Sequence, residues 1–347
     1  MLDRAQSLER LGIEHPIVQA PMAGGASTPA LAAAVSEAGG LGFLAAGYKS
    51  AAAVREEITQ TRALTSRPFG VNVFLPAADT VDGSAVRAYW KHLLPEAERL
   101  EVGPGSPPGD RTDGWDAKIE DLLADPPPVV SFTFGCPDLG TVSEFQVQGT
   151  FVIVTVTTQD EALSAATAGA DALCVQGAEA GGHQGSFVND TAGTPLRELL
   201  PAVRTITTVP LIAAGGLGTG EHIAEVIELG ADAAQLGTAF LRCPESGAHP
   251  VHKAALADPR STQTALTRAF TGRPARSLVN RFVEQYGEHA PAAYPDVHYL
   301  TSPLRRSAAE REDPDAMSLW AGTSFRLAVD APAAEIVATL AEGVQRA

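Results

Sequence analysis

Basic residues are scarce in this chain. Its 347 residues include 25 lysines and arginines against 41 aspartates and glutamates, so the formal net charge is -16. Non-specific binding to nucleic acids depends on basic patches that neutralise phosphates. The charge balance therefore argues against a nucleic-acid-binding protein.

Cysteine is also rare. The three cysteines, Cys136, Cys174 and Cys243, lie far apart and form no CxxC motif. Neither a structural zinc site nor a disulfide framework is expected from such spacing. We therefore expect no metal, and we interpret the cysteines as small buried hydrophobic residues.

Long apolar runs are missing as well. No run of about 18 apolar residues exists, so we expect no membrane-spanning helix. Residues 1–10 are charged and lack the apolar centre of a signal peptide. We therefore expect a cytoplasmic protein, and the 45% of hydrophobic residues is enough for a large core.

Eight short apolar segments are typical of buried strands, because each is bounded by glycine, proline or polar residues. They lie at residues 17–20, 41–45, 69–74, 128–132, 150–156, 172–176, 210–214 and 233–236. Helical segments follow most of them, and the first has Thr28 as a suitable N-cap before Pro29. The further helices are predicted at residues 51–64, up to about 145, and at 159–168, 195–206 and 220–229.

This alternation predicts parallel βα units. Eight units predict an α/β fold of the TIM-barrel type, a closed (β/α)8 barrel, rather than an open doubly wound sheet. An open sheet usually carries GxGxxG after its first strand. Here the first strand ends in Pro21-Met22 instead.

Three parts of the chain are predicted from composition. The barrel covers residues 1–242, with an insertion at about residues 76–127 that is rich in charge and contains a proline-rich and glycine-rich break. Residues 243–316 are predicted to form an additional, mainly helical substrate or lid domain. Residues 317–347 are predicted to return to the barrel and to end in an apolar helix.

Glycine-rich loops follow the last three predicted strands. Gly181-Gly182 follows the sixth, Gly215-Gly216 and Gly218 follow the seventh, and Gly237-Thr238 follows the eighth. TIM barrels keep their chemistry at the strand C-termini and often bind phosphate after strands seven and eight. The loops therefore predict a phosphorylated flat cofactor, with FMN the natural candidate, although the same glycines would also serve tight turns.

Of the eight histidines, only His183 lies in a glycine-rich loop directly after a predicted barrel strand. A histidine held there can act as a base for a neutral substrate, or as a positive or hydrogen-bonding partner for an anion. His183 is therefore the candidate catalytic residue. His298, near the end of the second domain, is a weaker candidate for the pocket.

Motifs spread over nearly the whole chain resemble the nitronate monooxygenase family, formerly called 2-nitropropane dioxygenase, and its class I branch in particular. The matching segments are QAPMAG at residues 19–24, GLGFLAAGY at 40–48, FGVNVF at 69–74, EAGGH at 179–183, AAGGL at 213–217, QLGT at 235–238, LTSPLR at 300–305 and MSLWAG at 317–322. The resemblance implies a barrel that holds FMN without a covalent bond and contains no metal. It also implies that alkyl nitronates, such as propionate 3-nitronate, are oxidised by O₂ to a carbonyl compound and nitrite.

The resemblance also assigns roles to residues. His183 matches the family's catalytic histidine. The predicted flavin-binding residues are Ala20, Pro21, Met22, Asn72, Gln176, Gly181, Gly182, Gly215, Gly216, Gly218, Gly237 and Thr238. Tyr299 and Ser302 are candidate substrate residues, with Arg305 nearby. Thr133 departs from the pattern, because relatives often carry a histidine there.

Two other functions remain open at this stage. An NAD(P)H-dependent quinone or enoyl-thioester reductase on the same flavin barrel would share the glycine turns. A non-catalytic barrel that binds a phosphorylated ligand would share them as well. Either a monomer or a homodimer is compatible with the sequence.

Overall fold

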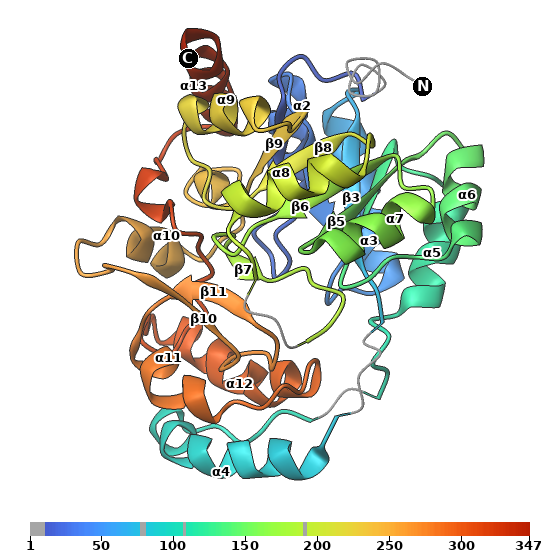
Figure 1. Ribbon diagram of the computed structural model, residues 1–347. Helices are drawn as coiled ribbons and strands as arrows, with labels where there is room; N and C mark the ends of the chain where they lie inside the picture. The colour runs from blue at the N-terminus through green and yellow to red at the C-terminus, as the bar shows by residue number, and fades with distance from the viewer. Residues whose placement is uncertain (1–10, 77–80, 107–108, 190–192) are drawn as a thin grey trace.

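The computed structural model describes residues 11–76, 81–106, 109–189 and 193–347, so the charged segment 1–10 lies outside the described residues. Its larger sheet contains eight parallel strands (Figure 1). They are β1 (Ile17–Gln19), β2 (Gly42–Ala45), β3 (Phe69–Phe74), β4 (Val129–Thr133), β5 (Phe151–Val156), β6 (Ala172–Gln176), β8 (Leu211–Ala214) and β9 (Ala233–Leu236). Each boundary lies within one residue of the predicted one.

The sheet closes on itself. Its strand order is β1-β9-β8-β6-β5-β4-β3-β2, and the two end strands meet through a parallel bridge between Val18 and Leu41. The Gln19 N–H donates to the Leu41 carbonyl oxygen at 2.9 Å across this seam. The prediction of a TIM barrel is therefore confirmed.

Helices surround the barrel, and the first of them begins at its expected cap. They are α2 (Pro29–Glu37), α3 (Ala51–Leu64), α6 (Leu139–Val147), α7 (Gln159–Thr167), α8 (Leu196–Ile206), α9 (Gly220–Glu228) and α13 (Ala333–Arg346). The Thr28 hydroxyl accepts from the Leu31 N–H at 3.0 Å, which satisfies one of the free donors at the start of α2. Pro29 occupies the first turn, where its missing N–H costs nothing.

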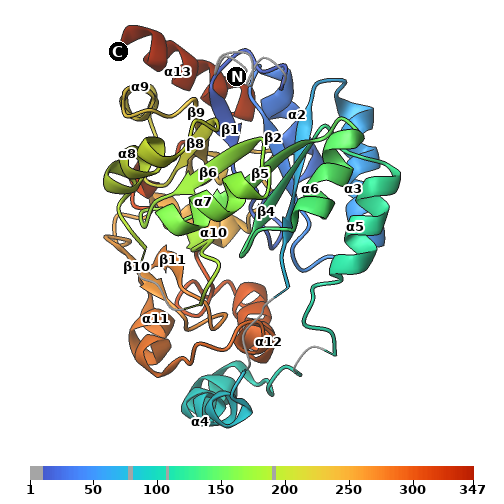
Figure 2. The same cartoon turned by 45° about the vertical axis from the view of Figure 1, so that its right-hand side comes forward.

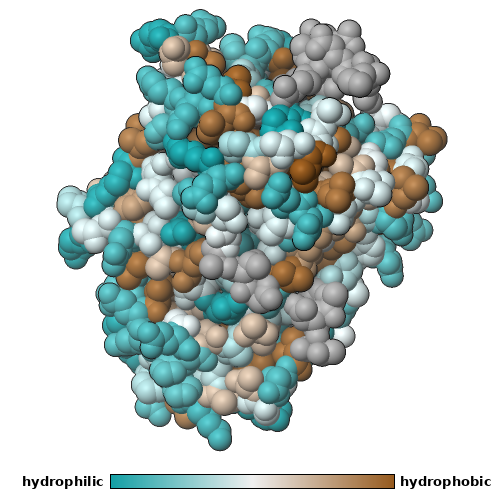
Figure 3. All heavy atoms as spheres, viewed as in Figure 1, coloured by the Kyte–Doolittle hydropathy of each residue, from teal (hydrophilic) through white to brown (hydrophobic). Residues whose placement is uncertain are grey.

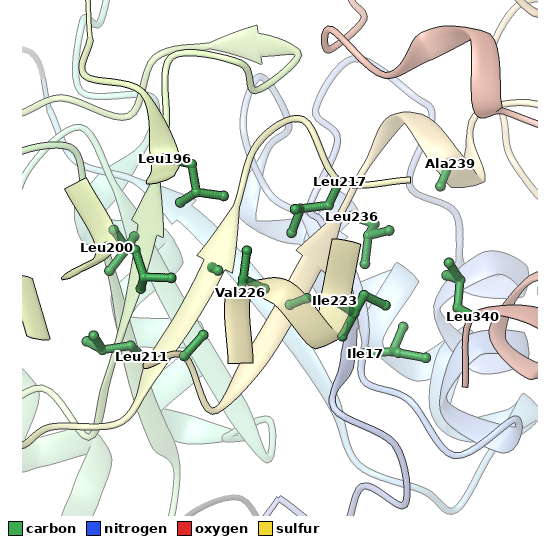
Figure 4. Packing of buried hydrophobic residues seen from close by; sticks show 14 of the residues in the cluster. Ile17, Leu196, Leu200, Leu211, Leu217, Ile223, Val226, Leu236, Ala239 and Leu340 are labelled. Atoms are coloured by element: carbon green, nitrogen blue, oxygen red, sulfur yellow. The ribbon is translucent and has the colours of Figure 1, made fainter. Parts of the chain in front are cut away.

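The strands are buried on both faces, which explains their continuous apolar sequences. In β6, Leu173 and Val175 pack outward against the helices, whereas Ala172 and Cys174 fill the barrel interior. Figure 4 shows the outer layer, where Leu200 of α8 and other helix residues pack against strand residues. Burial of this layer is the main free energy that holds the helices on the barrel.

A second unit lies at one end of the barrel. It contains α4 (Gly83–Leu100) from the insertion together with α11 (Arg281–Tyr286) and α12 (Asp296–Glu310), and both views place these helices side by side (Figures 1 and 2). They share a hydrophobic cluster that includes Tyr89, Phe282 and Leu304. The other helix of the insertion, α5 (Trp115–Ala124), packs against α3 instead.

The segment after the barrel also contains strands that the sequence did not predict. β10 (Thr264–Thr267) and β11 (Ala275–Leu278) are antiparallel, and β11 also pairs with the two-residue strand β7 (Gly182–His183). α10 (Pro250–Ala257) and the 3₁₀ helices η1 (Thr238–Phe240), η2 (Gly287–His289) and η3 (Phe325–Leu327) complete the elements. The small sheet thus connects the glycine loop after β6 to the second unit.

The surface carries no large apolar face on the side that Figure 3 shows, where hydrophobic residues lie in small groups among hydrophilic ones. Within the described residues, no helix is both long and apolar enough to cross a membrane. The same residues hold no group of three or more histidine, cysteine, aspartate or glutamate side chains arranged to bind a metal ion.

Candidate active site

A cavity of about 970 Å³ opens at the C-terminal ends of the barrel strands, where the second unit covers them. Thirteen of the fifteen predicted site residues line it. They are Ala20, Pro21, Met22, Asn72, Gln176, Gly181, Gly182, His183, Gly215, Gly216, Gly237, Thr238 and Ser302. Segments that are far apart in sequence therefore converge as the barrel geometry requires.

Gly218 and Tyr299 do not line the cavity. Gly218 faces η3, since a Cβ atom there would lie 3.0 Å from Leu327. On α12, the cavity-lining positions are His298, Ser302, Arg305, Arg306 and Ala309, which lie along one face of a helix because they follow one another at spacings of three or four residues, with Arg306 beside Arg305. Tyr299 lies outside this stripe, because one residue turns the helix by about 100°. Its ring packs edge-on against His298 with centroids 5.1 Å apart.

His183 is half-buried in the cavity wall, and a hydroxyl group holds its ring. Its Nε2 atom lies 2.9 Å from the Thr271 hydroxyl oxygen. The Thr271 hydroxyl donates to the Arg273 carbonyl oxygen at 3.3 Å, so its oxygen is available to accept from Nε2–H. This arrangement favours the tautomer whose Nδ1 atom is unprotonated. The pairing of β7 with β11, which sets Ala275 opposite His183, fixes the backbone on this side.

The electrostatics of the cavity keep His183 neutral. Burial, followed by the positive charges of Arg273 and Arg305, lowers the pKa of His183 to about 3. Aromatic rings enclose the imidazole: Phe134 lies 5.8 Å away and Trp320 5.5 Å away, centroid to centroid. At neutral pH the imidazole of His183 therefore carries no positive charge.

Asn72 belongs to a chain of polar side chains along the barrel mouth. Its Nδ2 atom donates to the Ser131 hydroxyl at 2.9 Å and to the Thr133 hydroxyl at 3.0 Å. Thr133 in turn lies 3.4 Å from the hydroxyl oxygen of Thr155. The threonine that stands where relatives often carry histidine thus orients Asn72.

Gln176 closes the loop that carries His183. Its side-chain oxygen accepts from the Gly185 N–H at 2.7 Å, and its Nε2 atom donates to the His183 carbonyl oxygen at 3.3 Å. Both ends of the amide are used, so the loop is fixed at the strand from which it leaves. Gln176 therefore positions His183, whether or not it also contacts a ligand.

The aromatic residues Tyr48 and Tyr294 beside the cavity were not predicted from the sequence. Tyr48 stacks on His298 with ring centroids 4.0 Å apart, and the Tyr294 hydroxyl donates to the Tyr48 hydroxyl at 3.2 Å. Tyr48 adopts φ +66, a left-handed conformation that costs energy for a residue with a side chain. The sequence offered one indication of Tyr48, its position directly after Gly47 at the end of a predicted strand. No local pattern singles out Thr271 or Tyr294.

A family model described as nitronate monooxygenase matches residues 6–343. The chain is 41% identical over 354 residues to a nitronate monooxygenase of Pseudomonas aeruginosa, with 99% of both proteins covered. It is 36% identical to a probable nitronate monooxygenase of Staphylococcus aureus (strain Newman), which covers 98% of this chain and 97% of the relative.

Solved structures agree with these matches. A nitroalkane oxidase from Streptomyces ansochromogenes is similar with a TM-score of 0.95 and 53% identity, and 98% of each chain is covered. FabK from Thermotoga maritima is similar with a TM-score of 0.74 and 29% identity, covering 98% of this chain and 96% of the other. Together with the cavity at the barrel mouth, the matches over nearly the full length show that this chain is an oxidoreductase that belongs to the nitronate monooxygenase family.

Proposed function

We propose that this enzyme uses FMN to oxidise alkyl nitronates with O₂ to a carbonyl compound and nitrite. The observation that carries the proposal is the composition of the cavity wall, which includes His183 and the cations Lys253, Arg305 and Arg306 but no aspartate or glutamate among the described residues. Such a wall suits an anionic cofactor and an anionic substrate in a chain whose net charge is -16. Family membership supports a flavin in general, and FMN is our specific proposal.

The residues present fit FMN. Gly215 and Gly216 adopt φ +116 and +69, conformations that favour glycine, and the Gly216 N–H has no acceptor within the described protein. A Cβ atom on Gly237 would lie 3.3 Å from the Ala20 Cβ, so the loop after β9 lies close to the loop after β1. We propose that these glycines and Thr238 hold the phosphate. We also propose that Asn72 and Gln176 contact the ring.

When bound, FMN would supply the electron transfer to O₂, which no side chain can perform. His183 then has a restricted role. Because its imidazole is neutral, it serves as a proton acceptor for neutral nitroalkanes through Nδ1, and not as the positive partner of a nitronate. The Thr271 hydroxyl holds the ring in the tautomer that this role needs.

The second unit lies over the cavity at the barrel mouth. We propose that residues 243–316, together with α4, form the substrate-binding unit and exclude water from the cavity. Phe134, Tyr294 and Trp320 lie around the His183 ring. An apolar, dry surrounding strengthens the electrostatic interactions of the bound anion.

Two measurements on one preparation test the proposal. The purified protein should show a flavin absorption spectrum and should release FMN on denaturation. In air it should convert propionate 3-nitronate to nitrite. Protein that cannot take up FMN would instead favour a non-catalytic ligand-binding barrel.

Anaerobic mixing with NADPH separates the proposal from a reductase function. The flavin spectrum should stay oxidised over the time in which nitronate is turned over in air. Rapid bleaching by NADPH would favour a quinone or enoyl-thioester reductase. That comparison is needed because a reductase on the same flavin barrel would share the glycine turns.

A further inference from the structure

Three cations line the cavity, and their surroundings differ. The Lys253 ammonium donates to the carbonyl oxygens of Cys243 and Ser246, each at 2.8 Å, so it holds a loop. Arg306 is exposed to solvent. Arg305 is the cation at the end of the cavity where His298 and His183 lie, and its charge lowers the pKa values of both histidines.

Within the described residues, Arg305 donates its hydrogen bonds to neutral acceptors. Its Nη2 atom donates to the His298 carbonyl oxygen at 2.8 Å and to the Ser302 hydroxyl at 3.0 Å, with the His298 Nδ1 atom at 3.3 Å. Its Nε atom donates to the Thr301 hydroxyl at 3.2 Å. Within the described part of the chain, Arg305 has no carboxylate partner, and its Nη1 atom has no protein acceptor.

Arg305 is half-buried in the cavity wall. A guanidinium partly withdrawn from water without a counter-charge is costly, because neutral acceptors replace only part of the hydration that the ion loses. Its surroundings offer no negative group. Tyr48 and His298 are both neutral: burial raises the pKa of the tyrosine above its ordinary value, and burial together with Arg305 lowers that of the histidine to about 2. Asp113, behind Tyr48, already pairs with Lys118 at 2.7 Å. A bound anion is therefore the partner that this end of the cavity lacks.

We propose that Arg305 is the specificity-determining residue of this cavity: its Nη1 group donates hydrogen bonds to the charged oxygens of a nitronate and thereby favours the anion over the neutral nitroalkane. The inference rests on the proposed function and deepens it. Charge-assisted hydrogen bonds from a planar guanidinium suit the planar group of two oxygens on one nitrogen. A neutral nitroalkane carries much less charge on the same oxygens, so its hydrogen bonds to the guanidinium contribute less to binding.

The test compares binding of a planar anion with binding of a neutral nitro compound. Nitrate and 2-nitropropane are titrated anaerobically into the FMN-loaded protein, and the flavin absorption spectrum reports each dissociation constant. Arg305→Gln should weaken nitrate binding roughly 10- to 100-fold, the effect of losing a hydrogen bond to a charged group. Binding of 2-nitropropane should change much less. Equal losses for both ligands, or no loss for nitrate, would overturn the proposal.

Two further variants serve as controls for this comparison. Arg311→Gln removes the same charge at the end of α12, where the side chain bonds to the Leu100 carbonyl oxygen outside the cavity, and nitrate binding should be unchanged. Arg305→Lys keeps the charge but not the fork geometry. Burial lowers the pKa of a lysine, so nitrate binding by Arg305→Lys should weaken between pH 7 and pH 9 more than binding by the wild type. If Arg305→Gln does not retain FMN, the pH dependence of nitrate binding by Arg305→Lys tests the proposal instead. Identical pH dependence in Arg305→Lys and the wild type would overturn the proposal.

Nitrate binding does not depend on turnover, so the two proposals fail separately. Wild-type protein that binds nitrate through Arg305 but does not oxidise nitronate would contradict the proposed function. Wild-type protein that oxidises nitronate while nitrate binds equally well to Arg305→Gln would contradict only the role of Arg305.

Discussion

At His183, burial and the guanidinium groups of Arg273 and Arg305 act in the same direction and keep the imidazole neutral. Thr271 fixes one nitrogen, and aromatic rings lie against the imidazole. Arg305, Lys253 and Arg306 are the cations of the cavity wall, whereas His183 is uncharged. We propose that Arg305 holds an anion and that His183 removes a proton from a neutral substrate.

His183→Asn should still bind FMN, because we expect His183 beside the ring and not at the glycine loops that we assign to the phosphate. Any wild-type activity on a neutral nitroalkane should fall by about 10²- to 10⁴-fold, the usual contribution of a positioned base. Activity on preformed nitronate, which has no proton to lose, should fall less. Both rates are measured on the same preparation, with nitronate added last, and equal losses would remove the role as a base.

Gly237 is the second position that a single substitution can test. Gly237→Asp should lose FMN, because its carboxylate would crowd and repel the phosphate. Gly237→Ala adds only a methyl group, which would meet the Ala20 Cβ at 3.3 Å, and should keep more of the cofactor. The FMN content of the two variants, from absorbance after denaturation, gives the comparison. Full occupancy in Gly237→Asp would show that the phosphate binds elsewhere.

At the scale of elements, the insertion between β3 and β4 supports the cavity from behind. Asp113 accepts a hydrogen bond from the Tyr48 N–H at 3.0 Å and pairs with Lys118, whose side chain is fully buried. Burial raises the pKa of the Asp113 carboxyl, and the Lys118 ammonium opposes that rise. The insertion thus holds Tyr48 in its left-handed conformation.

Removing Asp113 should cost both stability and substrate affinity. Asp113→Ala leaves the buried Lys118 unpaired, and we expect a loss of about 3–5 kcal/mol in the free energy of unfolding. The double variant Asp113→Ala with Lys118→Met should recover most of that stability. It should not recover the KM for nitronate, because Tyr48 remains untethered. A double variant with wild-type KM would show that the tether serves stability alone.

Most elements could be predicted from the sequence, for a physical reason. Barrel strands are buried on both faces, so each reads as an apolar run with a turn residue at its end, and all eight fell within one residue of their predicted bounds. β10 and β11 were not predicted because their sequences, TALT and ARSL, contain no continuous apolar run. The rotation of α12, which turns Arg305 inward and Tyr299 aside, depends on packing between distant segments.

In the site, too, the residues that follow from local sequence patterns could be predicted, and those placed by packing between distant segments could not. The glycine loops and His183 sit at strand ends, where the fold fixes their place once the strands are known. Contacts such as Tyr48 with His298 join residues 250 positions apart by the packing of the second unit on the barrel. No local pattern encodes such a contact, so the aromatic side of the cavity required the structure.

At the scale of the whole molecule, buried neutral histidines should make the protein sensitive to acid. Burial lowers the pKa values of His183, His252 and His298 to about 3, 4 and 2, below the ordinary value of 6.5. The unfolded chain takes up protons below pH 6.5 that the folded protein does not bind. Stability is therefore fully present above about pH 6.5 and falls as the pH drops towards the folded pKa values.

His252→Gln tests this dependence, since glutamine can still donate to the Trp320 carbonyl oxygen that His252 contacts at 3.0 Å. Each buried histidine contributes up to about 1.4 kcal/mol per pH unit to the slope of the unfolding free energy. Urea unfolding of the variant between pH 4.5 and pH 6 should give a slope shallower by about that amount. The same slope as the wild type would mean that His252 takes up its proton in the folded state.

The central claim concerns the chemistry at the barrel mouth, and an oxygen-electrode trace tests it most directly. FMN-loaded protein is equilibrated in air, propionate 3-nitronate is added, and nitrite is assayed in the same cell. We predict that O₂ consumption begins with the addition, that nitrite accumulates with it, and that protein stripped of FMN does neither. Fully FMN-loaded protein that consumes no O₂ and forms no nitrite would contradict the account.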